Sequence, residues 1–184
     1  GYVEEAPRRF LDIDEIRHLV TGFAELGLWK VRLTGGEPTV RKDFAQIAAT
    51  VSAIPGIGKV ATTTNGYQLA KHAQLWRDAG ISAINISIDS LDPVNFQRIT
   101  GMDHLPRVLK GVDAAEAAGF DDIKINTVLL KDLNHHELDR FLDFVKDRQI
   151  SLRFIELMET GDNAAYFEKH HLCASTIIKA LVAR

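Results

Sequence analysis

The sequence predicts an α/β protein built on a parallel β-sheet. Short apolar runs with strand character recur along the 184 residues, and segments with helical periodicity separate them. Strands that alternate with helices of about 10–15 residues are typical of βαβ units, and these units form parallel sheets. Successive strand-like runs begin roughly 25–40 residues apart, a spacing that suits either an open doubly wound sheet or a barrel.

The first expected element is a helix over residues 13–26. Asp12 is its expected N-cap, and Gly27 follows its end. One stripe of this helix is apolar and comprises Ile16, Leu19, Val20 and Phe23. Because a repeating α/β protein usually starts on a strand, we expect that a first strand is missing from this chain.

Five strands and five further helices are expected after the first helix. The strands cover residues 28–34, 59–64, 83–89, 123–130 and 151–157. The helices cover residues 43–54, 69–79, 105–118, 134–148 and 174–183. Pro55-Gly56, Gly80 and Gly119 end the first three of these helices. Asn134-His-His-Glu137 is expected to form a capping box that opens the fourth.

Polar side chains recur on one face of every expected strand. A parallel strand buried on both faces should be nearly continuous Val, Ile and Leu. Here alternate positions are polar instead: Arg32, Thr34, Thr63, Asn65, Asn85, Ser87, Asp89, Lys124, Asn126 and Arg153. One explanation is an antiparallel or half-exposed sheet with one wet side. The regularly interposed helices favour a barrel in which the apolar faces pack outward on helices and the polar faces line a lumen.

Such a lumen must be wet or hold a charged ligand. Leaving Arg32 and Lys124 unpaired in a dry interior would cost several kcal/mol each. Ligands of such barrels gather at the carboxyl ends of the strands, where Gly35-Gly36-Glu37 follows the first expected strand. Glycine has no Cβ, so the backbone at Gly35 and Gly36 can approach a ligand closely.

Composition excludes several classes of partner and site. The net charge of −3 and the absence of a basic run speak against nucleic-acid and membrane-surface partners. No apolar stretch approaches the ~18 residues that span a bilayer. The single cysteine, Cys173, points to a reducing cytoplasmic location and cannot by itself supply the thiolates of an iron–sulfur cluster. His135-His136 and His170-His171 lack the spacing of a zinc site, so no metal site is expected within the chain.

Five ordered motifs carry a family resemblance. They are "VRLTGGEPTVRKDF", "TTTNGYQL", "INISIDSLDP", "IKINTVLLKDLN" and "LRFIELMETG". In this order and spacing they resemble the radical S-adenosylmethionine (SAM) superfamily, and within it the GTP 3′,8-cyclase family of molybdenum cofactor biosynthesis. The resemblance covers essentially the whole chain.

The resemblance implies a partial TIM-type (βα)6 barrel, of which residues 1–184 would be a single-domain core that lacks the first strand and a C-terminal extension. Enzymes of this family carry two [4Fe–4S] clusters, one on an N-terminal CxxxCxxC motif and one on three C-terminal cysteines. The first cluster reduces SAM to a radical that abstracts hydrogen from C3′ of GTP. Neither cysteine motif is present in this chain, so we expect the ligands to lie before Gly1 and after Arg184 and the fragment itself to be inactive.

The resemblance also assigns roles to individual side chains, none of them catalytic. For SAM these are Gly35, Gly36 and Glu37 at the methionyl end, Ser87 at the carboxylate or ribose, and Met158 at the adenine. Glu37 would accept hydrogen bonds from the α-ammonium group. Without the resemblance, the glycines would be read as a turn that ends a strand, Ser87 as a satisfied hydroxyl and Met158 as core filler.

For GTP the resemblance assigns Arg32, Thr63 and Lys124. Two cations that face one lumen from separate strands would help to neutralise a triphosphate, although structural ion pairs would explain them too. Arg153 is a weaker candidate of the same kind, and Asn126, on the same face as Lys124, could contact either ligand. Asn65 and Asp89 are weaker candidates for residues that support the SAM contacts. The turn-forming hydrogen bonds that Asn and Asp make with nearby backbone are an equal alternative for Asn65 and Asp89.

Two other functions remain open at this stage. One is a different radical SAM enzyme, such as a peptide-modifying maturase, although Arg32 ahead of TGGEP and "RFIELM" argue against it. The other is a cluster-free α/β barrel that binds a nucleotide or sugar phosphate, which the cysteine count favours. Missing end elements would expose a strand edge and apolar helix faces, so some self-association is expected, with a homodimer as one form.

Overall fold

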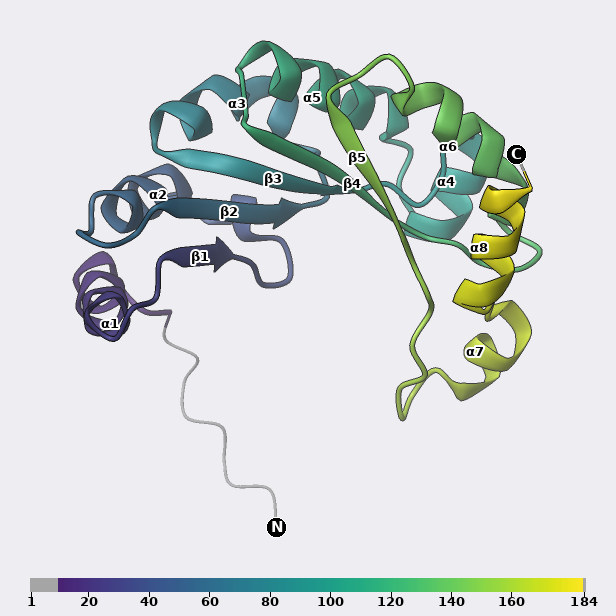
Figure 1. Ribbon diagram of the computed structural model, residues 1–184, viewed down its shortest axis with the longest axis horizontal. Coiled ribbons are helices and arrows are strands. Elements are labelled where there is room, and N and C mark those ends of the chain that lie inside the picture. Colours follow the sequence, from purple (N-terminus) through teal and green to yellow (C-terminus); the bar gives the residue numbers. More distant parts are fainter. Residues whose placement is uncertain (1–9, 184) are drawn as a thin grey trace.

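The computed structural model describes residues 10–183, and five parallel strands form its centre (Figure 1). The strands are β1 (Lys30–Leu33), β2 (Lys59–Thr64), β3 (Ile81–Ser87), β4 (Asp122–Val128) and β5 (Ile150–Ile155). Each strand pairs in parallel with the next strand along the chain, so the sheet order is β1-β2-β3-β4-β5. The predicted parallel sheet is confirmed, and the antiparallel alternative is wrong.

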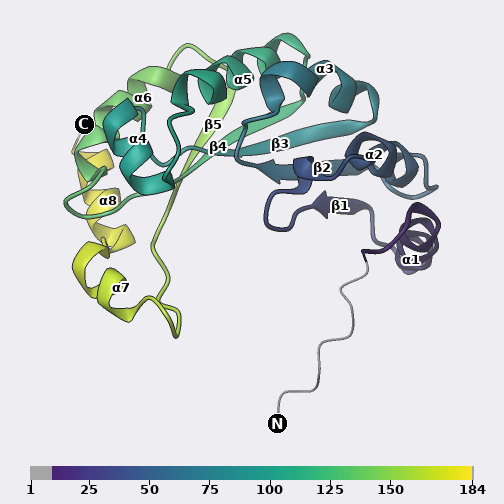
Figure 2. The ribbon, with the colours of Figure 1, turned by 180° about the vertical axis from the view of Figure 1, so that it is seen from behind.

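In the described part of the chain, one helix precedes the first strand, five lie between strands and two follow the last strand, and the helices between the strands cover one face of the sheet (Figure 1). The helices are α1 (Ile13–Glu25), α2 (Phe44–Ser52), α3 (Leu69–Asp78), α4 (Pro93–Thr100), α5 (Leu105–Ala117), α6 (Leu138–Val145), α7 (Ala164–His170) and α8 (Ala174–Val182). Figures 1 and 2 show α2, α3, α5 and α6 one after another along the outside of a curved sheet. No helix within residues 10–183 crosses the inside of the curve, so the protein is a partial TIM-type barrel.

The core lies between the sheet and its outer helices. Alternate strand residues point into it, namely Val31, Leu33, Val60, Ile84, Ile86, Ile123, Ile125, Leu152 and Phe154. Phe44 of α2 packs edge-to-face on Trp76 of α3 with ring centroids 5.2 Å apart. Because side chains alternate across a strand, the polar residues between these apolar ones must face the inside of the curve. The structure therefore confirms an apolar outer face and a polar inner face.

The predicted start of α1 is confirmed, but half of its apolar stripe is exposed. Asp12 and Glu15 form a capping box, in which Asp12 Oδ1 accepts from the Glu15 N–H at 2.9 Å. Ile16 and Val20 pack against the core, whereas Leu19 and Phe23 are about half exposed. None of the helices in the described range is long and apolar enough to cross a membrane.

Two short helices were not predicted. α4 begins with Asp92 as N-cap and Pro93 as its first residue, and it ends on Gly101 at φ 74°. These start and stop signals are present in the sequence, but Phe96 is the one buried residue of this helix, so the apolar periodicity is weak. α7 is only seven residues long, and its buried residue is His170. The remaining predicted elements exist: the strand over residues 59–64 has the predicted bounds, and the ends of the other elements differ from the prediction by at most four residues.

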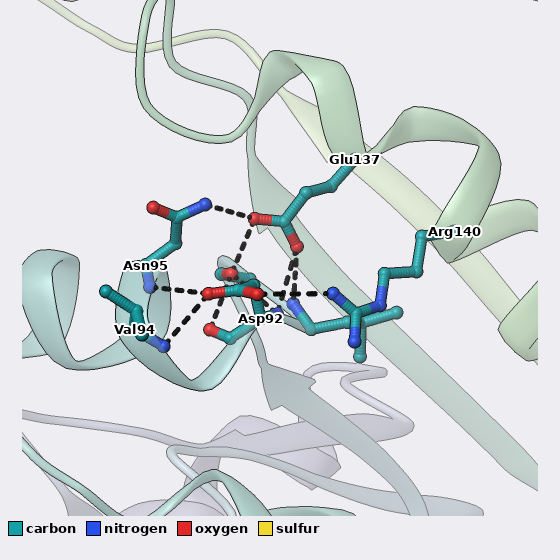
Figure 3. Close-up of polar contacts among 7 residues, drawn as sticks. Asp92, Val94, Asn95, Glu137 and Arg140 are labelled. Carbon is teal, nitrogen blue, oxygen red and sulfur yellow. Dashed lines mark hydrogen bonds and ion pairs between the residues drawn. The ribbon is translucent and has the colours of Figure 1, made fainter.

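The predicted capping box at Asn134 is wrong. Asn134 makes no side-chain cap, a 3-10 turn (His135–Glu137) follows it, and α6 begins only at Leu138. The Asn134 amide instead accepts from the Leu130 N–H at 2.6 Å and donates to the Val128 carbonyl at 2.9 Å. The buried Glu137 carboxylate makes its hydrogen bonds outside its own turn: it accepts four from residues at the start of α4 (Figure 3). Both side chains join loops instead of capping a helix.

Candidate functional site

The loops that follow β1 and β2 are joined by the carboxylate of Glu37. Its Oε1 accepts from the Thr39 N–H at 3.1 Å, the Thr39 hydroxyl at 2.6 Å and the Thr64 hydroxyl at 2.8 Å. Its Oε2 accepts from the Asn65 N–H at 2.6 Å. A carboxylate with this many donors is fixed in position. Glu37 therefore holds a carboxylate in place at the carboxyl end of the sheet.

Gly35 and Gly36 border open space. A Cβ added to either residue would meet no atom within 4 Å, and both glycines are exposed. Neither has a positive φ, so the chain's own backbone does not require glycine there. Both line a cavity of about 530 Å³ together with Leu33, Glu37 and Phe44. Their missing side chains are explained if another molecule approaches this backbone.

A second cavity lies at the carboxyl ends of β2 and β3. It has a volume of about 480 Å³, and its lining includes Asn65, Ser87 and Asp89. Burial raises the pKa of the Asp89 carboxyl group, whose Oδ1 accepts from the Val128 N–H at 2.8 Å. Asn65 Oδ1 accepts from the Tyr67 N–H at 3.0 Å, which is the local turn bond named as the alternative for Asn65. The structure thus brings three sequence-predicted residues to one cavity.

The three residues assigned to GTP lie on the inner face of the sheet. The Arg32 guanidinium donates to the Thr63 hydroxyl at 3.2 Å. Thr63 is in register with Asn85, and Asn85 is in register with Lys124, so a polar row crosses three strands. The Lys124 ammonium also forms an ion pair with Asp122 of the same strand. The structural ion pair that was the alternative explanation for Lys124 therefore exists.

Positive charge accumulates around Lys124. Burial is the main cause that lowers its pKa, and repulsion from nearby cations lowers it further. Those cations are Arg153, Lys59, Lys30 and Arg32. An anion bound among them would relieve this repulsion, so the inner face has the electrostatics of an anion-binding surface.

Asn126 carries an unsatisfied polar atom on the same face. Its Oδ1 is buried and has no hydrogen-bond partner within residues 10–183. Asn126 is in register with Ser87 on β3 and with Arg153 on β5. Buried acceptors without a donor are uncommon and costly, and a ligand hydroxyl or amine would satisfy this one.

Met158 is exposed and is not part of either cavity. It follows β5, is 75% exposed, and its carbonyl accepts from the Asn163 side chain at 3.1 Å. It lines neither of the two cavities. The nearby Glu156 accepts from the Ala174 N–H at 2.7 Å and pairs with the His171 ring, which ties the end of β5 to α8. Met158 therefore lies on a loop whose beginning is anchored to α8 by Glu156.

Sequence reasoning missed three charged residues and two hydroxyls of this region. Lys30, Lys59 and Asp122 have the same strand parity as Arg32, Thr63 and Lys124, a signal that could have placed them on the inner face. The Thr64 hydroxyl was missed because its partner Glu37 lies on a different loop. The Thr39 hydroxyl is close to Glu37 in the sequence, but only the folded loop shows that it donates to the carboxylate.

The residues present suit SAM but not an iron–sulfur cluster. Glu37 offers a carboxylate for an ammonium group, and the glycines leave room for a ligand backbone. Among residues 10–183, no group of three or more His, Cys, Asp or Glu side chains is placed to hold a metal ion. The chain has one cysteine, and a [4Fe–4S] cluster needs several thiolates.

Residues 3–145 match the family model of the radical SAM superfamily. Curated relatives named GTP 3′,8-cyclase are 53% identical over 95% of the chain in Klebsiella pneumoniae, 56% over 93% in Tolumonas auensis and 52% over its whole length in Stenotrophomonas maltophilia. The chain covers 53%, 51% and 56% of these relatives, so it spans about half their length.

Solved structures agree on the fold. Methylornithine synthase matches with a TM-score of 0.68 at 15% identity, covering 96% of this chain and 54% of that protein. HydG, a maturase of the [FeFe]-hydrogenase, matches with a TM-score of 0.62 at 16% identity, covering 86% and 40%. The family match covers most of the strands and helices that build the two cavities and the inner face. The chain belongs to the radical SAM superfamily.

Proposed function

We propose that this chain is the core of a GTP 3′,8-cyclase. Such an enzyme uses SAM to convert GTP to (8S)-3′,8-cyclo-7,8-dihydroguanosine 5′-triphosphate in molybdenum cofactor biosynthesis. The observation that carries the proposal is the identity of at least 52% to proteins named GTP 3′,8-cyclase over nearly the whole chain. A carboxylate-lined loop and a cationic inner face, each suited to one of the two ligands, support it.

SAM would bind at the carboxyl ends of β1 to β3. Its α-ammonium group would meet Glu37, whose Oε2 accepts one hydrogen bond from within residues 10–183 and retains a lone pair for a second donor. Gly35 and Gly36 would admit the methionyl backbone. Ser87, with Asn65 and Asp89 beside it in the second cavity, would hold the carboxylate or ribose. Met158 would contact the adenine from the loop after β5. Bound SAM supplies the radical chemistry of the superfamily.

GTP would lie along the inner face of the sheet. Arg32 and Lys124 would neutralise its triphosphate, and Thr63 would orient the Arg32 guanidinium through their 3.2 Å hydrogen bond. Arg153 lies close enough to lower the pKa of Lys124, so it would share the same anion. Asn126 Oδ1 would accept from a hydroxyl or amine of either ligand. GTP and SAM would thus occupy neighbouring regions of one lumen.

Both [4Fe–4S] clusters would be held by cysteines outside these 184 residues, because the chain supplies one thiol. We therefore propose that the chain by itself is inactive. Reading the coding sequence upstream of Gly1 tests this point. An in-frame CxxxCxxC motif shortly before Gly1 supports the cyclase, whereas its absence favours the cluster-free nucleotide or sugar-phosphate barrel, the second candidate that the cysteine count allows.

Calorimetric titration of the chain with GTP and with SAM tests the assignment of the two regions. We expect Lys124→Ala to weaken GTP binding at least tenfold and to leave SAM binding within about twofold, because its ammonium lies among the inner-face cations. Glu37→Gln should do the reverse. Lys131→Ala, which removes an exposed lysine on the loop after β4, is the matched control. Equal GTP affinities for the chain and Lys124→Ala would refute the assignment.

A further inference from the structure

Five cations gather on the inner face, and the carboxylate of Asp122 pairs with two of them. The cations are Lys30, Arg32, Lys59, Lys124 and Arg153. Asp122, at the start of β4, forms ion pairs with two of them. Its Oδ2 lies 3.0 Å from Lys59 Nζ, and its Oδ1 contacts Lys124 Nζ. Lys59 belongs to β2, so this one carboxylate links cations from two strands that are separated by β3.

The side chains of Asp122 and of the two lysines that it pairs with are largely shielded from water. The exposed fractions of the Lys124, Lys59 and Asp122 side chains are 15%, 26% and 27%. An ammonium with so little water needs a counter-charge, and Asp122 supplies it to both lysines. A phosphate that approaches Lys124 meets the negative charge of Asp122 at close range. Ligand and carboxylate therefore compete for the same two ammonium groups.

We propose that Asp122 sets the anion affinity of this face: it is the internal counter-ion of Lys124 and Lys59, and an incoming polyphosphate must displace it. This inference rests on the proposed binding of a nucleoside triphosphate here. Asp122 is a positioning residue that acts through the two lysines. Its repulsion grows with the charge of the ligand, so it weakens triphosphate binding more than monophosphate binding.

Asp121 provides a matched control. It is the neighbouring residue, carries the same charge, and pairs with Arg77 of α3 at 2.9 Å on the helix side of the sheet. Asp121→Asn and Asp122→Asn therefore change the net charge equally and differ in the face of the sheet that they affect. A general effect of net charge on anion binding would appear in both variants.

The test is calorimetric titration of the chain and both variants with inorganic triphosphate, inorganic phosphate and GTP at two salt concentrations. We expect Asp122→Asn to bind triphosphate about 3- to 10-fold more tightly at low salt, with a smaller gain for phosphate and at higher salt. Asp121→Asn should stay within about twofold. Unchanged or weaker triphosphate binding by Asp122→Asn would overturn the proposal.

A ligand-free measurement tests the counter-ion directly. The pKa of Lys124, followed by NMR of labelled lysine side chains, should fall further in Asp122→Asn, because the remaining neighbours are cations. An unchanged lysine titration contradicts the inference. If Asp122→Asn fails to fold, the pair Lys59→Gln and Lys59→Gln/Asp122→Asn replaces it, and the double variant must bind triphosphate more tightly than the single one.

The outcomes separate this inference from the proposed function. In one outcome, Asp122→Asn binds inorganic triphosphate more tightly but no variant binds GTP. This result supports the counter-ion role of Asp122 and refutes the cyclase assignment. In the other outcome, Lys124→Ala abolishes GTP binding and Asp122→Asn leaves it unchanged. This result supports the cyclase assignment and refutes the counter-ion role of Asp122.

Discussion

Replacing Glu137 by glutamine should strongly destabilise the protein, although the change is nearly isosteric. The Glu137 side chain is buried, and each carboxylate oxygen accepts two hydrogen bonds. Oε1 accepts from the Ser90 hydroxyl at 2.7 Å and the Asn95 amide at 3.0 Å. Oε2 accepts from the Leu91 N–H at 2.8 Å and the Asp92 N–H at 3.2 Å. Figure 3 shows this convergence on the start of α4.

A glutamine amide keeps one of the two oxygens and sets an NH₂ group against two donors. Two hydrogen bonds to a charged acceptor are lost, each worth about 1.5–3 kcal/mol in a buried site, and the donors that remain are unsatisfied. The Ser90 hydroxyl and the Asn95 amide can reorient to accept from the new NH₂ group, and this offsets part of the loss, so we expect Glu137→Gln to lower the free energy of unfolding by about 2–3 kcal/mol. That is a large share of the roughly 5–15 kcal/mol typical of a domain.

Urea denaturation followed by circular dichroism measures the effect, with the m-value unchanged if unfolding stays two-state. Hydrogen exchange at the Leu91 and Asp92 amides should accelerate as well. The control is Asp143→Asn on the solvent side of α6, whose pair with Lys146 at 3.6 Å is highly exposed and should contribute less than about 0.5 kcal/mol. A loss below 0.5 kcal/mol for Glu137→Gln would refute this account of the carboxylate.

Three further substitutions test other parts of the structure. Thr64→Val removes a buried hydroxyl that donates to Glu37 and accepts from a backbone N–H, so it should lower the free energy of unfolding by about 1–3 kcal/mol in urea, while Thr64→Ser should not. Burial raises the pKa of Asp89, so the folded state holds that proton more tightly than the unfolded state and stability falls as pH rises from the ordinary to the raised value. Asp89→Asn should therefore be more stable than the parent at neutral pH but not at acid pH; a constant difference across pH would contradict this. Gly111→Ala places a Cβ 2.9 Å from a backbone oxygen and should cost about 1–3 kcal/mol, whereas Gly22→Ala meets no atom within 4 Å and should gain about 0.5–1 kcal/mol; equal melting temperatures would refute the packing argument.

Local patterns predicted most of the architecture. The alternation of Val31 and Leu33 with Arg32 predicted a strand with one apolar and one polar face, and the structure has both. Asp12 predicted the start of α1 because an N-cap acts within one helical turn. The short helices α4 and α7 were not predicted because each buries a single residue, which is too few to show a helical periodicity of apolar residues.

Parts of the candidate site could also be proposed from local patterns in the sequence. The Gly35-Gly36-Glu37 loop and the polar strand ends are visible as motifs, and the structure brings Asn65, Ser87 and Asp89 to one cavity. The sequence indicated that Lys124 is a cation of the inner face but not that Asp122 and Lys59 share its charge network. Met158 was assigned by resemblance alone, and in the structure it is exposed and lines neither cavity.

The sequence by itself determined the alternation of strands and helices, the polar face of each strand and the membership that the five motifs indicate. Only the tertiary structure decided which polar groups meet. Glu37 and Thr64 are 27 residues apart, Lys59 and Asp122 are 63 apart, and Ser90 and Glu137 are 47 apart. A period-two or period-3.6 pattern states which face a side chain occupies, but the register and order of the strands set the distances between faces of different elements. Hydrogen bonds and ion pairs act over about 3 Å, so their partners are defined only once the sheet is assembled.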